Sequence, residues 1–318
     1  MRDSVIGFYS LLAAAVIPGD VAAAPPPRAP VTNLNVVTFA CIGDFGSDVP
    51  GTRIVANFIK TWQPQFIITL GDNNYPSGSA LTIDRNLGQF YHEFIHPYLG
   101  RYGRGARANR FFPSLGNHDW VATNAAPYLA YFTLPGNERY YSFVRGPIEL
   151  FCVDSDRKEP DGVTPESVQG QWLRTSLANS TSIWKIVYFH HAPYSSGILH
   201  GSYTNETTYM RWPFKEWGAS VVLSGHDHIY ERIEVDGLTY IVNGLGGDSR
   251  DQFHYPLVPG SVKQFNAEVG VLRVDATVKA LVFRFLTWNG RLIDTFVLRA
   301  GPLSVATNTP SALARPGP

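Results

Sequence analysis

Five short motifs along the chain carry side chains that bind metal ions. The side chains are carboxylates, an amide and imidazoles, and these oxygen and nitrogen donors suit zinc, iron or manganese. The motifs are Gly43-Asp44-Phe45-Gly46, Gly71-Asp72-Asn73-Asn74-Tyr75, Gly116-Asn117-His118-Asp119, Val187-Tyr188-Phe189-His190 and Gly225-His226-Asp227-His228. One such motif is weak evidence, because Gly-Asp is a common turn and many His-x-His pairs bind nothing. Five in order, each after an apolar run, predict one polynuclear metal site.

The residue types single out six candidate ligands. We choose Asp72 as a carboxylate that bridges two ions, because its motif also offers Tyr75 three residues on. The glycine before each of four ligands is expected to allow a sharp turn where a strand ends. The candidates are Asp44, Asp72, Asn117, His190, His226 and His228.

Strands must carry these motifs, and the apolar runs before them predict five. A strand that ends in a ligand delivers it to one edge of a sheet, where α/β proteins collect their ligands. Helical patterns at 52–61 and 165–177 alternate with these runs, as in βαβ units. Four more runs near the C-terminus, joined by short turns, are expected to be antiparallel. The five runs lie at 36–42, 66–70, 110–115, 184–189 and 219–223, and the four at 238–242, 269–274, 280–286 and 292–298.

The composition is that of a globular protein with a substantial core. Of 318 residues, 44% are hydrophobic and 16% charged, and the formal net charge is zero. A neutral chain gives no support to a nucleic-acid partner or an anionic membrane surface. We therefore expect an α/β fold of two packed mixed β-sheets with helices outside.

The five motifs together resemble a known family. The patterns GDxG, GDxxY, GNH[DE], VxxH and GHxH are those of the calcineurin-like metallophosphoesterases, and within them of the purple acid phosphatases. The most discriminating residue is Tyr75, because the wider superfamily usually lacks this tyrosine. The resemblance covers roughly residues 35–300 and implies a four-layer αββα sandwich. In size the chain is closer to the short, tartrate-resistant type than to the large plant type.

The resemblance implies two metal sites that share Asp72. Asp44, Asp72, Tyr75 and His228 would hold Fe³⁺, and Asp72, Asn117, His190 and His226 would hold a divalent ion, Fe²⁺, Zn²⁺ or Mn²⁺. His190 is preferred to His191, because Tyr194 and Ser195 then align with the family without a gap. The resemblance also implies that His118 and His200 are the catalytic candidates for protonating the leaving group.

The implied charge balance indicates the substrate. Two metal ions bring five positive charges, and two aspartates, a tyrosinate and a hydroxide remove four, so the site attracts a phosphate anion. We predict an acid phosphatase that hydrolyses small-molecule or protein phosphate monoesters by attack of a metal-activated hydroxide. The alternatives are a phosphodiesterase or nucleotidase on the same metal core, and a non-catalytic exported binding protein.

One further motif suggests a different enzyme class. His92-Glu93-Phe94-Ile95-His96 spells the HExxH signature of zinc proteases, which needs both histidines on one continuous helix. Pro97 disfavours helical angles at His96, so a capping segment beside the site is the preferred interpretation.

The termini predict export. Arg2, an apolar run at 5–17 and Ala22-x-Ala24 are typical of a signal peptide at residues 1–24. We expect a Pro-rich lead at 25–34, one catalytic domain at 35–300 and a disordered Pro/Ala-rich tail at 301–318. The apolar run is too short to span a bilayer, so a secreted or periplasmic protein with no membrane span is predicted.

The remaining signals concern cysteines and glycosylation. Cys41 and Cys152 each lie in an apolar strand-like run, which favours buried thiols over a disulfide. Neither has a Cys-x-x-Cys partner, so a thiolate zinc site is excluded. Asn179 and Asn205 begin glycosylation sequons, which matter only in a eukaryotic host. The sequence leaves the oligomeric state open.

Overall fold

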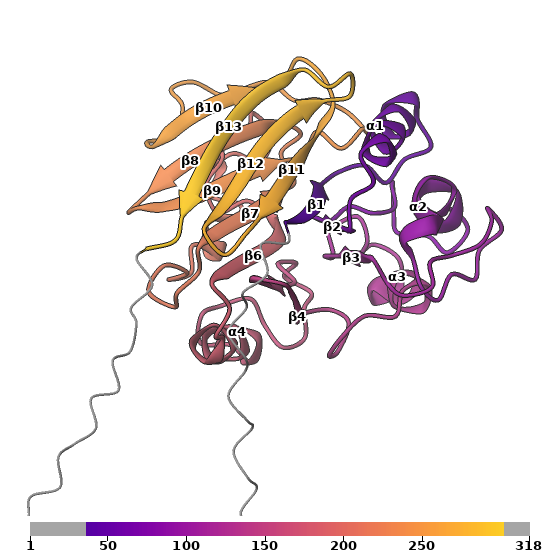
Figure 1. The fold of residues 1–318 in the computed structure, drawn as a ribbon, viewed down its shortest axis with the longest axis horizontal. Coiled ribbons are helices and arrows are strands. Elements are labelled where there is room, and N and C mark those ends of the chain that lie inside the picture. The colour runs from indigo at the N-terminus through magenta and orange to yellow at the C-terminus, as the bar shows by residue number, and fades with distance from the viewer. Residues whose placement is uncertain (1–35, 302–318) are drawn as a thin grey trace, which may run out of the picture. The chain divides into compact units, whose positions relative to one another are not determined.

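Two packed β-sheets form the centre of the fold in the computed structural model, which describes residues 36–301 (Figure 1). The first sheet has six strands in the order β13-β12-β11-β1-β2-β3. Strands β1, β2 and β3 are parallel, and β11, β12 and β13 extend the sheet from β1 in antiparallel pairs. The strands are β1 (Val37–Ile42), β2 (Phe66–Thr69), β3 (Phe111–Pro113), β11 (Gly270–Ala276), β12 (Ala280–Thr287) and β13 (Leu292–Arg299).

The second sheet has seven strands in the order β10-β8-β9-β7-β6-β5-β4. Its centre is parallel, because β5, β6, β7 and β9 run the same way. Strand β4 pairs antiparallel with β5 at one edge, and β8 and β10 follow β9 in antiparallel pairs at the other. The strands are β4 (Tyr141–Arg145), β5 (Ile148–Cys152), β6 (Trp184–His191), β7 (Val221–Gly225), β8 (Tyr230–Val235), β9 (Leu238–Asn243) and β10 (Ser261–Phe265).

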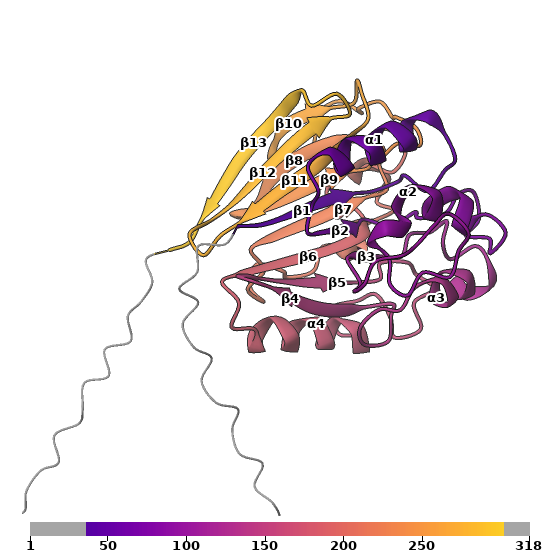
Figure 2. The ribbon, with the colours of Figure 1, turned by 45° about the vertical axis from the view of Figure 1, so that its right-hand side comes forward.

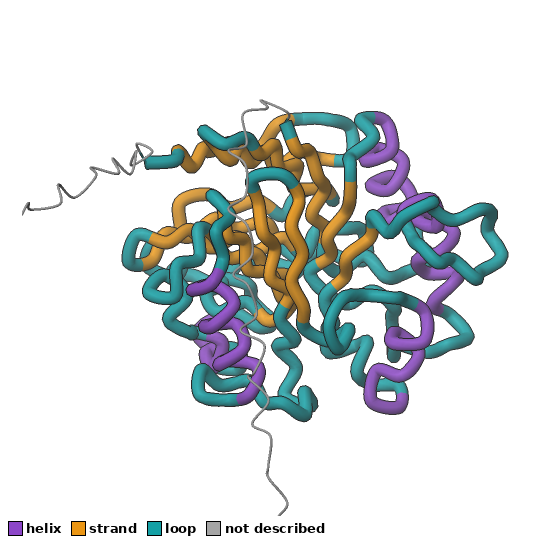
Figure 3. Tube along the Cα trace, turned by 60° about the horizontal axis from the view of Figure 1, so that its bottom comes forward, coloured by secondary structure: helices purple, strands orange, loops and turns teal. Residues whose placement is uncertain are grey.

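Helices lie outside the two sheets (Figures 2 and 3). Helix α1 (Pro50–Thr61) begins with a proline, whose missing N–H is not needed in the first turn. Its buried side chains include Val55 and Ile59, which lie on one face of the helix at i, i+4 spacing. The remaining helices are α2 (Gln89–Tyr91), which follows a π-helical turn at Asp84–Gly88, α3 (Ala126–Tyr131) and α4 (Val168–Asn179).

Strand β6 shows how the layers pack. Ile186 and Tyr188 belong to the large core cluster that also contains Phe39 of the first sheet. The alternate residues Val187 and Phe189 belong to a second cluster with Leu173 and Leu177 of α4. Because successive side chains of a strand point to opposite faces, β6 is buried on both sides. The order is therefore helix, sheet, sheet, helix.

The predicted α/β sandwich of two mixed sheets flanked by helices is confirmed, and so are the nine predicted strands, with shifts of one or two residues at their ends. Strands β4, β5, β8 and β10 were not in the predicted set. In β8 and β10 charged residues interrupt any apolar run, because these strands lie toward the edge of the sheet and are partly exposed.

One predicted pairing is wrong in part. Strands β11, β12 and β13 are antiparallel as expected. Strand β9 is antiparallel only to its hairpin partner β8 and pairs parallel with β7 in the other sheet. Apolar runs that follow one another in the sequence have the same pattern whether or not they belong to one sheet. Only the long-range strand pairing shows which sheet each of them joins.

Several predictions lie outside residues 36–301, namely the signal peptide, the Pro-rich lead and the C-terminal tail. Their boundaries stay predictions. Within the described part of the chain, no helix has the length and apolar character needed to cross a bilayer.

Candidate metal centre

The five motifs meet at the carboxyl ends of strands from both sheets. Three follow β1, β2 and β3 of the first sheet, and two end β6 and β7 of the second. The expectation of a single sheet edge is therefore wrong. The two sheets pack with these strand ends side by side, so each sheet contributes one wall of the site.

Asp44 connects the two walls. Its Oδ2 accepts a hydrogen bond from the backbone N–H of His226 at 2.9 Å, across the sheet interface. Its Oδ1 lies 3.5 Å from Nε2 of His228 and accepts the hydroxyl of Tyr75 at 3.3 Å. Tyr75 OH is also 3.1 Å from Nε2 of His228. The four side chains predicted to hold Fe³⁺ thus include three in mutual contact, Asp44, Tyr75 and His228.

Asp72 lies between this group and the second one. Its Oδ1 accepts the backbone N–H of His118 at 3.0 Å, which fixes the carboxylate. Its Oδ2 is 3.5 Å from Nε2 of His190. Ligand atoms of Asp44, Asp72 and His190 all lie within 4.8 Å of one another. This central place fits the predicted bridging role.

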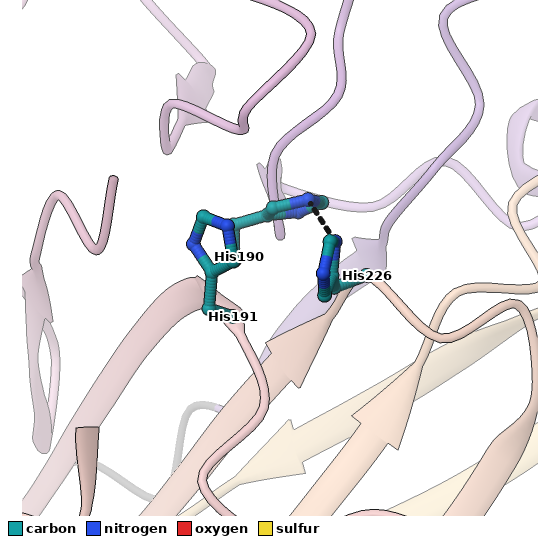
Figure 4. Close-up of side chains that lie close together, drawn as sticks. All are labelled: His190, His191 and His226. Carbon is teal, nitrogen blue, oxygen red and sulfur yellow. Dashed lines mark hydrogen bonds between the residues drawn. The ribbon is translucent and has the colours of Figure 1, made fainter. Parts of the chain in front are cut away.

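His190 has a defined tautomer. Its Nδ1 lies 2.7 Å from the carbonyl oxygen of Leu70, which only accepts, so Nδ1 carries the proton. The lone pair of Nε2 then faces Oδ1 of Asn117 at 2.8 Å. It also faces Nδ1 of His226 at 3.1 Å (Figure 4). The predicted divalent ion would take its ligands from this cluster of His190, Asn117 and His226.

His191 points elsewhere. Its Nδ1 is 2.9 Å from Oγ of Ser155, and its ring lies 4.6 Å from the ring of His226 (Figure 4). The geometry places His190, and not His191, against Asp72 and Asn117. His191 still lies close enough to His190 and His226 to share a cation with them.

Both catalytic candidates border the cluster. Nδ1 of His118 donates to the carbonyl oxygen of Pro76 at 2.6 Å, and its Nε2 is 3.9 Å from Oδ2 of Asp72. The ring of His200 lies 4.0 Å from that of His226, and its Nδ1 is 2.9 Å from Glu206. Each imidazole is about one-third exposed (36% and 35%), so solvent and a leaving group can reach it.

The buried donor groups of the site fit a cation. Burial and the carboxylates of Asp72 and Asp44 raise the pKa of Tyr75 well above its usual range. Burial lowers the pKa of His190, but Asp72 and Asp44 outweigh it and raise the value. Nε2 of His226 is buried and has no hydrogen-bond partner among residues 36–301. Two buried carboxylates, an orphaned imidazole and a phenol fit a pair of metal ions, which would stabilise both anions and allow a phenolate.

Two histidines differ in charge preference. Burial and the neighbouring His191 and His190 lower the pKa of His226 well below its ordinary value, which favours the neutral, ligand form. Burial lowers the pKa of His228, but the hydrogen bond and charge of Asp44 raise it to about 9. Binding an ion at His228 therefore has to displace a proton.

The predicted role of the motif glycines in sharp turns is confirmed at Gly71 and not at the other three. Only Gly71 has a φ in the left-handed region, at +87°. A Cβ on Gly116 would lie 2.2 Å from Oδ1 of Asp72, so this glycine provides space for the carboxylate. The left-handed angles fall on the ligands themselves, with φ of 56° at Asp44, 53° at Asp72 and 75° at His226. Such strain is typical of functional sites.

Residues that the motif analysis did not assign support the ligands. Asp119 accepts the N–H groups of Asn73 and Gly116, and so ties two motifs together. Asp227 accepts the backbone N–H of His200 at 3.1 Å. Asp119 and Asp227 both lie inside the five motifs of the sequence analysis. Their position next to predicted ligands in the sequence could therefore have identified them as supporting residues.

The HExxH alternative is wrong in its geometry. His92–Phe94 form a 3₁₀ turn, and Ile95 is extended with φ −94° and ψ 136°. Nδ1 of His92 bonds to the carbonyl of Gly88, and Nδ1 of His96 to that of Ala106. The two imidazoles share no helix face and hold no common site.

A family model described as Calcineurin-like phosphoesterase matches residues 37–230, more than half of the chain. The chain belongs to the calcineurin-like phosphoesterase family. The family resemblance predicted from the five motifs is thereby confirmed.

Relatives in sequence are acid phosphatases. A purple acid phosphatase of Glycine max is 27% identical over 233 residues, which are 68% of this chain and 48% of that protein. Tartrate-resistant acid phosphatase type 5 of Mus musculus is 22% identical over 242 residues, 65% of this chain and 72% of that protein. The chain thus spans about half the length of the soybean protein.

Solved structures share the fold. Purple acid phosphatase PPD1 from yellow lupin seeds superposes with a TM-score of 0.66 at 18% identity, over 84% of this chain and 54% of the lupin chain. GAP50, the anchor in the inner membrane complex of Plasmodium, superposes with a TM-score of 0.64 at 20% identity, over 84% and 90%. At these identities the likeness establishes architecture alone.

Proposed function

We propose that this protein is an exported acid phosphatase that hydrolyses phosphate monoesters of small molecules or proteins at a binuclear metal centre. The observation that supports it most is the central carboxylate of Asp72, which lies against His190 on one side and the backbone of His118 on the other. Similarity to purple acid phosphatases and the clustered donor atoms of Asp44, Asp72 and His190 support the same function.

The residues divide into two groups around Asp72. Asp44, Tyr75 and His228 would hold Fe³⁺ with Asp72, and Asn117, His190 and His226 would hold Fe²⁺, Zn²⁺ or Mn²⁺ with it. When bound, the ions would supply a water of lowered pKa as the nucleophile and neutralise charge on the phosphoryl oxygens.

The side chains around the ions orient the substrate and move protons. His118, held through Nδ1 by the Pro76 carbonyl, presents Nε2 on the Asp72 side of the centre. His200, held by Glu206, presents its ring beside His226. Either imidazolium would give its proton to the departing oxygen of the ester.

The test begins with elemental analysis and a visible spectrum of the purified protein. A phenolate from Tyr75 on Fe³⁺ would give a charge-transfer colour, and Tyr75→Phe should bleach it without loss of fold. Tyr102→Phe, a tyrosine outside the centre, is the matched control and should keep the colour. A wild-type protein that contains Fe³⁺ and has no colour would exclude Tyr75 as a ligand.

Activity separates the remaining alternatives. The proposal expects turnover of p-nitrophenyl phosphate to exceed turnover of bis(p-nitrophenyl) phosphate. The reverse preference would favour a phosphodiesterase. No turnover of either ester by fully metallated protein would favour a non-catalytic binding protein.

A further inference from the structure

A loop that no motif identified reaches the same end of the second sheet as His190. Strand β5 is parallel to β6 and pairs with it, so the loop after Cys152 emerges beside the loop after His191. Oγ of Ser155 accepts the backbone N–H of His191 and lies 2.9 Å from its Nδ1. The loop after β5 is therefore tied to the wall of the metal centre.

Arg157 in this loop is held in a fixed place. Its guanidinium carbon lies 3.9 Å from the centre of the Tyr209 ring, and its Nη2 donates to the carbonyl oxygen of Glu206 at 3.3 Å. Tyr209 is itself fixed, because its hydroxyl donates to the carbonyl of Ser155 at 2.6 Å. The Tyr209 ring lies 6.3 Å from the ring of His191. The guanidinium thus stands two aromatic rings away from His226.

The charge of Arg157 is not neutralised by a carboxylate. Within residues 36–301, no carboxylate oxygen lies within 4.0 Å of it, although the side chain is exposed. The nearby carboxylate of Glu206 is engaged with His200 at 2.9 Å, and Oδ1 of Asp156 accepts the N–H of Lys158 at 2.8 Å. A preorganised, unpaired guanidinium is suited to bind a carboxylate or phosphate.

The arginines near Tyr75 differ from Arg157, because a carboxylate already pairs with each of them. A cavity of about 580 Å³ beside Tyr75 is lined by Asp48, Asp248 and Arg85 among others. Nε of Arg85 there is 4.0 Å from Asp48, and Asp248 accepts the hydroxyl of Ser47. Asp48 is also 3.6 Å from Nη2 of Arg53. Both arginines near this cavity are thus already paired with a carboxylate, so Arg157 is the better partner for an anionic group.

We infer that Arg157 is a specificity residue that binds a second anionic group on the leaving group. The preferred substrates are then phosphate monoesters whose alcohol part carries a carboxylate or another phosphate several bonds from the scissile phosphorus. This inference rests on the proposed phosphatase function and names its substrate class.

Two matched peptides test it with the metal-loaded full-length enzyme. Acetyl-Glu-phosphotyrosine-Glu-amide and acetyl-Gln-phosphotyrosine-Gln-amide have the same phenol leaving group and differ only in charge. The wild type should show a kcat/KM about two- to fivefold higher for the Glu peptide, the effect of one partly exposed ion pair. Raising the salt concentration should shrink this ratio toward one.

Variants assign the preference to one side chain. Arg157→Gln should bring the Glu/Gln ratio of kcat/KM to one, and Arg157→Lys should keep most of it because the charge remains. Arg174→Gln, an exposed arginine on α4, should keep the wild-type ratio. Thermal unfolding of each variant checks that the fold is retained.

Two outcomes would overturn the inference in distinguishable ways. Turnover of both peptides with an equal kcat/KM in the wild type, or an unchanged ratio in Arg157→Gln, contradicts the inference and leaves the phosphatase function standing. No turnover of either peptide or of p-nitrophenyl phosphate contradicts the phosphatase function and the inference together.

Discussion

At the scale of single residues, the centre is built from side chains whose orientation is set by backbone groups. Asp44 and Asp72 each accept one backbone N–H, from His226 and His118 respectively. The Leu70 carbonyl fixes the tautomer of His190 in the same way. Because the main chain already holds these donor side chains in place, they lose little conformational entropy when they bind an ion. The site is therefore preorganised.

His118 offers the sharpest test at this scale. Replacing it with alanine removes the imidazole and keeps the backbone N–H that holds Asp72. We expect His118→Ala to lose about 100-fold or more in kcat for an alkyl phosphate, as for loss of a general acid. The loss should be much smaller for p-nitrophenyl phosphate, whose leaving group departs without a proton.

The control for His118→Ala is His92→Ala, which removes an imidazole whose Nδ1 bonds to the carbonyl of Gly88, away from the metal centre. This control should retain activity with both substrates. An equal loss for good and poor leaving groups in His118→Ala would rule out its role as proton donor.

At the scale of elements, the parallel strands bring the loops that follow them to the same end of the sheet. Strands β5, β6 and β7 are parallel neighbours, so their following loops meet at one end of the sheet. This places the Arg157 loop beside the loop after His191. The same geometry explains why the site has contributions that no motif contains, since any loop at this end borders the centre.

Helix α4 supports the outer face of the sheet and makes a separate prediction about stability. Oγ of Ser167 accepts the backbone N–H of Gly170 at 3.1 Å and caps the helix. Ser167→Ala should lower the free energy of unfolding by about 1 kcal/mol, the usual cost of losing such a cap. Chemical denaturation measures it.

The matched control is Ser176→Ala, which lies inside the same helix. It should be neutral or slightly stabilising, because alanine has the higher helix propensity. A loss of the same size in both variants would show that the Ser167 cap carries no stabilisation.

At the scale of the whole molecule, the fold holds together without a covalent cross-link in the described chain. Cys41 and Cys152 are both buried as thiols, one in each sheet. The expectation of buried thiols is thereby confirmed. Burial raises the pKa of both thiols, since the thiolate is disfavoured in an apolar core.

The two thiols give a probe of global unfolding. The native protein should not react with Ellman's reagent, because both thiols are buried and protonated. In denaturant, 2 thiols per chain should react, the full cysteine content of the sequence. The rate under native conditions should follow the unfolding rate, and a reductant should leave the melting temperature unchanged.

A fast-reacting thiol in the native protein would contradict the buried position of Cys41 or Cys152. A melting temperature that falls on addition of reductant would indicate a disulfide instead. Neither outcome would affect the assignment of the metal centre, so this test is independent of the functional proposals.

The sequence by itself determined the donor types, their order and the strands that precede them, because all three are local features. Apolar runs encode the strands, and a glycine beside a donor marks the end of four of the five. A few neighbouring residues are enough to recognise each motif, as in Gly43-Asp44, Asn117-His118 and Gly225-His226. The family could be recognised for the same reason, since its five patterns are short and contiguous.

Only the tertiary structure decided which donors meet, because the pairing of distant strands joins them. Asp44 and His226 are 182 positions apart and come from different sheets, so no local pattern states their contact. The orientation of His190 against that of His191 depends on the Leu70 carbonyl and on Ser155. The position of Arg157 depends on the pairing of β5 with β6, and the sequence alone does not show this pairing.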